Sequence, residues 1–432
     1  MIAVMDERRM LEADAEEVRR AIGTARDVQR TWARRPIRER AALIGSLRSL
    51  IAEHAAELAQ ATGAAQGRPI SEKMVSEVLP LLEAARFLEK KSRQILRPKR
   101  FGIAGRPLWL WGSSFEVQRK PFGVILIVGP ANYPLFVPAV QMLHALAAGN
   151  AVVIKPAAGA SGPLTLLLDH VMRRSGIPFE LVHLLPESVE AAREAVRFGV
   201  EKAIFTGSSE NGRDFLGELA AQNTPSVMEL SGADAVFVRA DADVRLAARA
   251  IAFGLRLNAG NTCMAPQTII VHQSVEAALA KAMRAVGVES GGVFPVRDDE
   301  EALAIAGLDE HGLGAAIFSR DRRSARAFAD KLATGFVTIN DIIVPTADPR
   351  FPFGGVRGSG FGVTRGGQGL LEMTYGQNVS IRRTRFLPHL DSPRDGDEVI
   401  FGALIGCLHG SGLAKKLRAL LTLVRADRIR PK

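Results

Sequence analysis

Apolar and polar positions follow two different periods along this chain. Over residues 8 to 95, apolar side chains recur every three or four positions, as in AALIGSLRSLIAEHAAEL, and this spacing predicts helices. From residue 121 onward, continuous apolar runs alternate with helical stretches. The predicted strands are FGVILIVGP, AVVIKP, LVHLLP, KAIFTG and SVMEL, with helices predicted over 134–148, near 162–175, from Ser188 and from Asn211. Strands that are apolar throughout and separated by helices predict a parallel sheet covered on both faces, and hence an α/β fold.

The same alternation resumes in the second half of the chain. AVFVRA, TIIVH, GAAIFSRD and GFVTIN are predicted strands, and a helix is predicted over 243–257. These strands predict a second domain that begins near residue 233. Between the helical region and the first strand, the segment 101–120 has two β-prone runs around GSS at 112–114, which predicts a protruding hairpin. Its Trp109, Trp111 and Phe115 suit either a core or a contact between subunits.

The amino-acid composition indicates which classes of protein this chain can belong to. With 47% hydrophobic and 24% charged residues, the chain is typical of a soluble globular protein. Two cysteines cannot build a disulfide framework or a four-sulfur metal site, so we expect neither. The first twenty residues are charged where a signal peptide would be apolar, which predicts a cytoplasmic protein. The apolar run VIFGALIGCL near the C-terminus is too short to span a bilayer.

The net charge of +10 is concentrated in the C-terminal tail. Residues 377–432 hold 11 Lys and Arg against 5 Asp and Glu, a balance of +6. Within this tail, LAKKLRALLTLVRA at 413–426 has the spacing of a basic amphipathic helix. Two interpretations stay open: a helix packed on the body or on a partner subunit, and a helix lying on a membrane surface. No nucleic-acid-binding motif accompanies the basic residues, so no nucleic-acid partner is expected.

Polar residues that follow the predicted strands are the candidates for chemistry, because ligands bind parallel sheets at the carboxyl ends of the strands. Asn132 follows the first strand, and its amide can donate to a developing oxyanion or simply form a turn. Lys155 ends the second strand, where its ammonium can reach a ribose hydroxyl or a phosphate, or face solvent. Gly207, Ser208 and Gly212 occupy a strand-to-helix turn whose N–H groups attract phosphate.

Two further side chains suit acid–base or nucleophilic roles. Glu229 ends an apolar strand, where loss of solvent would raise its pKa and suit it to general-base catalysis, although an edge glutamate is the plainer alternative. Cys263 lies in the loop LNAGNTCMAP before a strand, and it is either buried packing or a nucleophile. A nucleophilic thiol needs a base nearby and a donor for the oxyanion.

These features occur in a fixed order, and with them the chain resembles the NAD(P)-dependent aldehyde dehydrogenases. The motifs that carry the resemblance are PFGVILIVGPANYP, AAGNAVVIKP, FTGSSENG, MELSG, NAGNTC and PFGGVRGSGFG, within residues 121–362. The resemblance implies two Rossmann-like parallel-sheet domains with a β-hairpin oligomerisation arm, and a homodimer or homotetramer. The implied domains are N-terminal helices (1–100) with a dinucleotide-binding domain (121–232), the hairpin (101–120), a catalytic domain (233–360) and a C-terminal segment (361–432).

The resemblance also implies a role for each motif residue. Cys263 would attack a small aldehyde to give a thiohemiacetal, with the Asn132 amide and the Cys263 N–H holding the oxyanion. Hydride transfer to the nicotinamide would leave a thioester, and Glu229 would activate water to release a carboxylic acid. The residues implied to contact NAD or NADP are Pro130, Lys155, Gly207, Ser208, Gly212 and Leu230.

The chain departs from the family pattern at several positions. Ala131 and Ser231 replace a tryptophan and a glycine. Ala157 and Ala158 follow Pro156, where the family often has a carboxylate that contacts the adenosine ribose, and this leaves NADP as open as NAD. The segment after Cys263 is several dozen residues shorter, and in ESGGVFPV Gly292 replaces the glutamate that grips the nicotinamide ribose. Two alternatives therefore remain: a catalytically impaired homologue that acts in binding or assembly, and a coenzyme A-dependent acylating enzyme.

Overall fold

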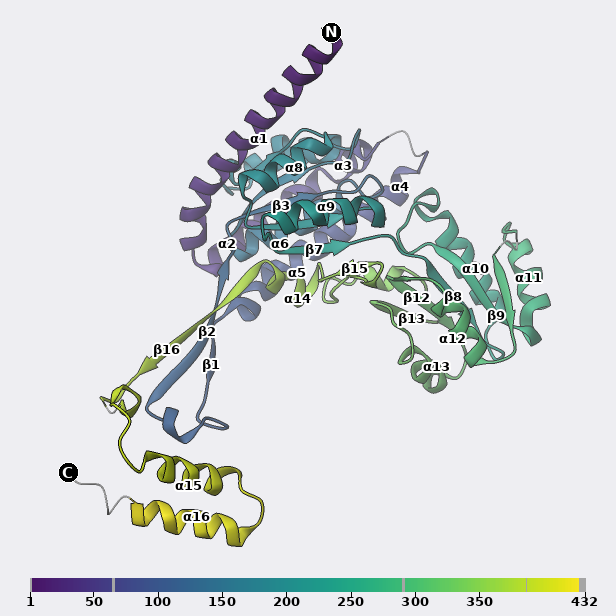
Figure 1. Cartoon of the computed structure of the whole chain (residues 1–432). Coiled ribbons are helices and arrows are strands. Elements are labelled where there is room, and N and C mark those ends of the chain that lie inside the picture. Colours follow the sequence, from purple (N-terminus) through teal and green to yellow (C-terminus); the bar gives the residue numbers. More distant parts are fainter. Residues whose placement is uncertain (1, 64–66, 290–291, 386, 427–432) are drawn as a thin grey trace. The chain divides into compact units, whose positions relative to one another are not determined.

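The computed structural model describes residues 2–63, 67–289, 292–385 and 387–426 (Figure 1). The chain divides into two compact units, one made of residues 1–99 and 117–378 and the other of residues 100–116 and 379–432. Each unit is described by itself below.

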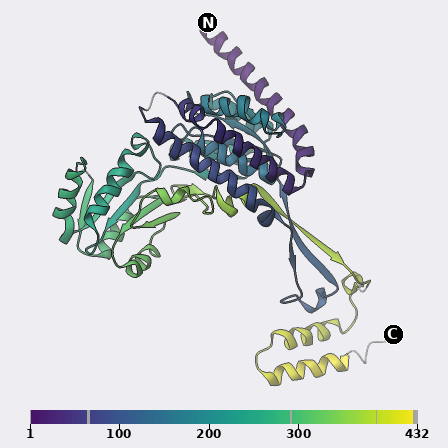
Figure 2. The ribbon, with the colours of Figure 1, turned by 180° about the vertical axis from the view of Figure 1, so that it is seen from behind.

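The N-terminal region is helical, as the apolar spacing predicts. Its helices are α1 (Ile2–Arg34), α2 (Ile37–Glu53), α3 (Ala55–Ala61), α4 (Ile70–Lys73) and α5 (Leu79–Leu96), with a π-helical turn at Met74–Val78. Seen from behind, these helices (purple and blue) cover one face of the first large sheet (Figure 2). The buried Trp32 of α1 fixes this packing, because its indole N–H donates to the carbonyl of Leu146 at 2.9 Å.

The first large sheet has six strands in the order β15-β7-β6-β3-β4-β5. Its parallel strands are β3 (Val124–Val128), β4 (Ala151–Lys155), β5 (Val182–Leu184), β6 (Lys202–Thr206) and β7 (Ser226–Glu229), and the antiparallel edge strand is β15 (Gly360–Phe361). The connecting helices are α6 (Phe136–Ala148), α7 (Gly162–Leu166), α8 (Val189–Phe198) and α9 (Ser209–Ala221). Every residue of β3, β4 and β6 is buried, which explains why these strands are apolar throughout.

The second large sheet has five parallel strands in the order β10-β9-β8-β12-β13. The strands are β8 (Asp234–Val238), β9 (Pro266–His272), β10 (Val293–Val296), β12 (Gly314–Phe318) and β13 (Phe336–Ile339). The helices are α10 (Val244–Arg256), α11 (Glu276–Ala285), α12 (Asp299–Gly307), α13 (Arg322–Ala329) and, after this sheet, α14 (Gly366–Glu372). A short pair of strands, β11 (His311–Gly312) and β14 (Val356–Arg357), completes the unit. The predicted α/β fold with two parallel sheets is confirmed.

The shortened segment after Cys263 ends at an edge of this second sheet. Strand β10 contains Phe294 and Pro295 of the ESGGVFPV motif, and Phe294 is 44% exposed. Ser290 and Gly291 of the same motif lie outside the described residues.

The predicted hairpin exists, but its turn was placed wrongly. The strands are β1 (Lys99–Phe101) and β2 (Ser113–Pro121), and β16 (Thr374–Arg382) pairs as a third strand in the order β1-β2-β16. The segment GSS at 112–114 therefore leads into β2 and is not the turn. The chain reverses earlier, because Gly105 adopts a φ of 74° and the Arg106 guanidinium donates to the carbonyl of Phe101 at 3.1 Å.

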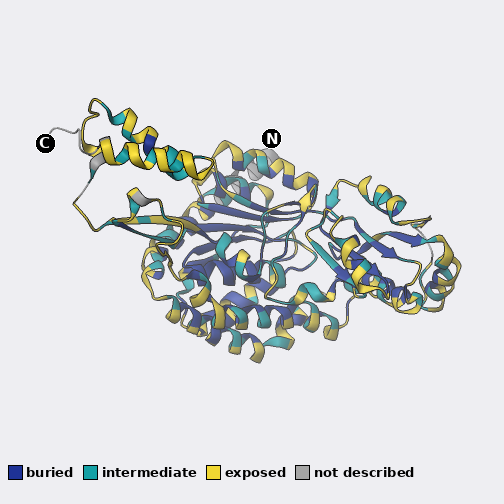
Figure 3. Ribbon diagram, turned by 90° about the horizontal axis from the view of Figure 1, so that it is seen from below, coloured by how far each residue is buried: buried dark blue, intermediate teal, exposed yellow. Residues whose placement is uncertain are grey.

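The C-terminal chain of the second unit forms two helices, α15 (Asp397–His409) and α16 (Leu413–Ala426), which pack against each other. Helix α16 has the bounds that the amphipathic spacing predicts. Helix α15 was not predicted, because Gly402 and Gly406 interrupt its apolar run. Figure 3 shows that most of the surface of both helices is exposed. Within the described ranges, no helix is both long enough and apolar enough to cross a membrane.

Candidate active site

A cavity of about 610 Å³ lies at the carboxyl ends of β3, β4, β6 and β7, beside the loop that precedes β9. Its lining includes most of the residues predicted from the sequence. These are Pro130, Asn132, Lys155, Gly207, Ser208, Glu229, Leu230 and Cys263. The chain separates the first and last of these residues by more than a hundred positions, so the fold brings them together, as the strand-end argument requires.

Gly212 is the exception among the predicted residues. It lies one turn inside α9, is buried, and does not line the cavity. A Cβ atom at Gly212 would lie 2.4 Å from Cδ2 of Leu230, so the glycine allows α9 to pack closely on the chain that follows β7. Gly212 thus packs against Leu230, and its contact with a dinucleotide stays a prediction. Ser208 caps the helix by accepting the N–H of Asn211 at 3.2 Å.

Cys263 and Glu229 meet in this cavity. The Cys263 Sγ atom lies 4.0 Å from Oε1 of Glu229, which ends β7 and is only 5% exposed. Burial raises the pKa of Glu229 to about 7, and the positive charge of Arg365 opposes this rise. Burial also raises the pKa of the Cys263 thiol, and the charges of Glu229 and Asp234 raise it further. At neutral pH the thiol is therefore protonated, beside a carboxyl group that can exchange a proton.

The loop before Cys263 has an unusual backbone. Asn258, Ala259 and Gly260 adopt φ values of 53°, 52° and 81°, in the left-handed region that disfavours residues with a Cβ atom. Two hydrogen bonds hold this conformation: Asn258 Nδ2 donates to the carbonyl of Asn132 at 2.8 Å, and the Asn258 N–H donates to Glu72 Oε1 at 3.0 Å. Backbone strain of this kind concentrates at functional sites and persists only where the surrounding structure enforces it.

Asn132 is oriented by two further contacts. Its Nδ2 donates to the carbonyl of Asn261 at 2.9 Å, and its Oδ1 accepts the N–H of Tyr133 at 3.0 Å. The Tyr133 hydroxyl in turn lies 2.8 Å from Oγ1 of Thr262, the neighbour of Cys263. A carboxamide carries two N–H bonds, so the bond to Asn261 leaves a second donor for a ligand.

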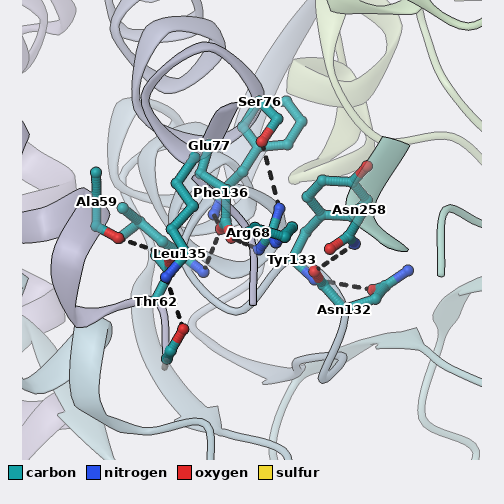
Figure 4. Close-up of polar contacts among 12 residues, drawn as sticks. Ala59, Thr62, Arg68, Ser76, Glu77, Asn132, Tyr133, Leu135, Phe136 and Asn258 are labelled. Atoms are coloured by element: carbon teal, nitrogen blue, oxygen red, sulfur yellow. Dashed lines mark hydrogen bonds and ion pairs between the residues drawn. The ribbon is translucent and has the colours of Figure 1, made fainter. Parts of the chain in front are cut away.

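Arg68 and Glu77 are functional candidates that sequence reasoning missed. Glu77 is fully buried, and its Oε2 accepts the N–H groups of Leu135 and Phe136 at 2.9 and 3.1 Å, at the start of α6 (Figure 4). Its Oε1 accepts a hydrogen bond from Arg68 at 3.1 Å, and burial raises its pKa against these contacts. The carboxyl group thus fixes the chain immediately after Asn132. A glutamate in an amphipathic helical region normally indicates a solvated face, so no pattern pointed to it.

Arg365 is a second functional candidate that sequence reasoning missed. It follows the PFGGVRGSGFG motif, and its guanidinium lies over the ring of Phe353, 4.1 Å from the centroid. One nitrogen donates to the carbonyl of Thr346 at 2.9 Å. Burial lowers its pKa, while the charges of Glu229 and Cys263 raise it. The arginine therefore supplies a buried positive charge that stabilises the anionic forms of both groups.

The other end of the cavity fits a dinucleotide. Lys155 ends β4 and is 8% exposed, and burial lowers its pKa while Glu187 opposes this effect. Glu187 itself accepts the N–H of Gly159 at 2.7 Å, which orders the loop after Lys155. The N-terminus of α9, preceded by Gly207, faces the same cavity. A lysine and a helix N-terminus in one cavity suit the ribose and phosphate groups of such a ligand.

The comparisons with known proteins agree with this geometry. The family model described as "Aldehyde dehydrogenase family" matches residues 8–289 and 292–379. The chain is 25% identical to 4,4'-diapolycopene aldehyde oxidase of Methylomonas sp, over 82% of this chain and 79% of that protein. It is 28% identical to benzaldehyde dehydrogenase [NAD(+)] of Pseudomonas putida, over 85% and 89%. The solved structure of an NAD-dependent aldehyde dehydrogenase from Sinorhizobium meliloti superposes with a TM-score of 0.81 at 23% identity, over 87% and 89% of the two chains.

Proposed function

This chain belongs to the aldehyde dehydrogenase family, and we propose that it oxidises an aldehyde to a carboxylic acid with NAD or NADP through a covalent intermediate on Cys263. The observation that carries the proposal is the convergence of a thiol, a carboxyl group and an amide in one cavity. Cys263 lies 4.0 Å from Glu229, and Asn132 lines the same space. These three groups are a nucleophile, a base and an oxyanion donor.

The first chemical step follows from the protonation states. The Cys263 sulfur bonds to the aldehyde carbon, and its proton passes to Glu229, whose pKa of about 7 allows it to accept a proton at neutral pH. The carbonyl oxygen becomes an alkoxide, and the Asn132 N–H that does not bond Asn261 donates to it. Arg365 stabilises negative charge at the cysteine and the glutamate.

The bound dinucleotide supplies the oxidant, because its nicotinamide accepts the hydride that leaves the substrate carbon. The resulting thioester on Cys263 is then attacked by water. Glu229 first releases the proton of the thiol to solvent, then takes the proton of that water and returns it to the thiolate as the carboxylic acid leaves. Because Glu229 serves both the thiol and the water, one carboxyl group of intermediate pKa suits both halves of the reaction.

The dinucleotide is assigned to the end of the cavity that contains Lys155. In this assignment, Lys155 holds the adenosine ribose, and Gly207 and Ser208 face the pyrophosphate, with Pro130 and Leu230 beside them. Ala157 and Ala158 carry no carboxylate that would repel a 2′-phosphate, whereas Glu187, which acts on Lys155, does carry one, so the proposal covers both NAD and NADP. Residues 1–100 with 121–232 are assigned to the dinucleotide domain, and residues 233–360 to the catalytic domain.

The hairpin is assigned to a contact between subunits of a homodimer or homotetramer. Trp109 and Trp111 are each 58% exposed in the unit that contains the hairpin, whereas an aromatic residue of a core would be covered. This assignment rests on exposure and on the resemblance of the arm to that of the family.

The two cysteines provide a matched test of the mechanism. The Cys263→Ser variant should lose formation of NADH or NADPH while it still binds the dinucleotide, and the control Cys407→Ser should retain both. A panel with benzaldehyde and a polyene aldehyde covers the substrates in the names of the two relatives above, and succinate semialdehyde adds a charged aldehyde. Turnover by Cys263→Ser at the wild-type rate would refute the covalent mechanism.

The same panel separates the rival functions. Reduced dinucleotide that appears only with coenzyme A, together with an acyl-coenzyme A product, would identify an acylating enzyme; Glu229 argues against this, since a base for water serves hydrolysis. Failure to form NADH or NADPH with any aldehyde, while the dinucleotide still binds, would favour the binding or assembly protein.

A further inference from the structure

The two C-terminal helices form a hairpin, α15 with α16, that has almost no core of its own. Among its described side chains, Ala403 alone is buried. The helices approach closely at Gly406, where an added Cβ atom would lie 3.2 Å from Cβ of Ala419. The two helices run alongside each other, but only one of their described side chains is buried, so the hairpin buries little apolar area and gains little stability from its own packing.

Helix α16 leaves an apolar stripe uncovered. The stripe consists of Leu413, Leu417, Leu420, Leu421 and Val424. Their exposed fractions are 78%, 54%, 50%, 53% and 51%, and their spacing places them on one face of the helix. A continuous apolar face of this kind on a folded protein marks a surface that another partner covers.

Helix α15 also exposes large apolar side chains. Phe401 and Ile405 are one helical turn apart and are 56% and 61% exposed. Figure 3 shows how little of either helix is covered within this unit. Both helices of the hairpin therefore present large apolar side chains outward.

The cations beside the apolar stripe of α16 indicate what kind of partner binds there. Residues 413–426 contain Lys415, Lys416, Arg418 and Arg425 and no acidic residue. At 100° per residue, Lys416 lies on one side of the apolar stripe, and Arg418 and Arg425 lie on the other. Apolar side chains flanked by cations match the boundary between the acyl chains and the anionic headgroups of a lipid bilayer.

Other partners fit this surface less well. A second copy placed on the stripe by a twofold axis would bring two identical sets of cations together, with no acidic residue of α16 between them. A nucleic acid would use the cations but would leave the leucines uncovered, and α16 carries no aromatic residue on which a base could stack.

We propose that the α15–α16 hairpin docks on the surface of an anionic lipid bilayer, with the apolar stripe of α16 inserted among the headgroups. Helix α16 has 14 residues and lies along such a surface without crossing it. This docking is independent of the chemistry at Cys263. It would concentrate the protein at a membrane, where apolar aldehydes dissolve.

The test uses the whole protein and vesicle flotation. The vesicles contain phosphatidylcholine alone, or equal amounts of phosphatidylcholine and phosphatidylglycerol. The wild-type protein should float with the anionic vesicles, should bind the neutral vesicles much more weakly, and should be released by high salt. Failure to float with the anionic vesicles would overturn the proposal.

Two variants probe the two parts of the surface. Arg418→Ala with Arg425→Ala should weaken partitioning into anionic vesicles by about 25-fold, since each cation near such a surface contributes about fivefold. Leu417→Gln with Leu421→Gln should weaken partitioning by at least about tenfold, because two exposed leucines no longer enter the bilayer.

The controls change an exposed leucine and two exposed cations elsewhere in the chain. Leu308→Gln, at a leucine that is 86% exposed, and Lys90→Ala with Lys91→Ala, at two exposed lysines of α5, should leave vesicle binding unchanged. All variants should keep wild-type turnover of a water-soluble aldehyde, which shows that they are folded. If the controls lost vesicle binding as much as the α16 variants do, the proposal that the hairpin is the binding surface would be refuted. A smaller oligomer in the leucine variant, with vesicle binding intact, would assign the stripe to a second copy and overturn the proposal.

Discussion

The substitution Glu229→Gln tests whether burial raises the pKa of this carboxyl group. It should change two measurable quantities: the pH dependence of the free energy of unfolding, and the rate of turnover. Glu229 is 5% exposed, and burial raises its pKa from an ordinary value of 4.5 to about 7. A difference of about 2.5 pH units corresponds to about 3 kcal/mol of preference for the protonated form in the folded protein. The opposing effect of Arg365 is already contained in this pKa, because the same guanidinium lowers it.

The sign of the effect on stability follows from the two pKa values. Below about pH 4.5 the carboxyl group is protonated in both the folded and the unfolded protein, and it has no pH-dependent cost. As the pH rises from 4.5 toward 7, the unfolded chain ionises first, so the free energy of unfolding falls by up to about 3 kcal/mol. The neutral amide of Glu229→Gln avoids this loss, so the variant should be more stable than the wild type by that amount at about pH 8, but not at low pH.

The measurement is urea unfolding of both proteins at about pH 4.5 and about pH 8, with Glu276→Gln, at an exposed glutamate of α11, as control. The stability difference for Glu229→Gln should grow with pH, and that for the control should stay near zero. In parallel, Glu229→Gln should lose steady-state turnover, because no base remains for the thiol or the water. A stability difference that is the same at both pH values would refute the raised pKa, and unchanged turnover would refute the catalytic role.

Two further substitutions test the groups around Cys263. Asn132→Ala removes the proposed oxyanion donor and should lower kcat by about 100- to 1000-fold, with little change in dinucleotide binding; an unchanged kcat would assign Asn132 to the turn alone. Glu77→Gln keeps the shape of the side chain that accepts the N–H groups of Leu135 and Phe136, but it weakens both bonds and the bond to Arg68. It should lower kcat more than it alters the KM for the dinucleotide, whereas equal changes in both would indicate a general loss of folding.

The strand ends explain why most of the candidate site could be predicted from the sequence. Asn132, Lys155 and Glu229 each follow an apolar run that proved to be a buried parallel strand, and such strands deliver their carboxyl ends to one edge. Cys263 was identified from the order of the sequence motifs, and it lies in the loop before β9, which lines the same cavity. These residues could be predicted from the apolar pattern and the order of the strands, because ligands bind parallel sheets at the carboxyl ends of the strands.

The features that could not be predicted from the sequence depend on tertiary contacts and on backbone angles. Glu77 becomes functional only because α6 starts beside it, and the left-handed conformation of Ala259 is enforced by contacts from Glu72 and Asn132 to its neighbour Asn258. The turn of the hairpin was misplaced because Gly105, not the GSS segment, reverses the chain. In each case the deciding contact comes from a residue distant in sequence or from a backbone angle that composition does not specify.

The shortened segment after Cys263 bears on the cofactor more than on the covalent chemistry. Among the described residues that line the cavity, Gln267 alone follows Cys263. Gly292, at the position where the family has a glutamate, accepts the N–H of Ile269 at the sheet edge and does not line the cavity. The proposed nucleophile, base and oxyanion donor therefore all line the cavity, whereas Gly292 has no side chain that could hold a nicotinamide ribose. A less firmly held nicotinamide should slow hydride transfer before it affects attack by the thiol, since hydride transfer depends on the alignment of two bound molecules.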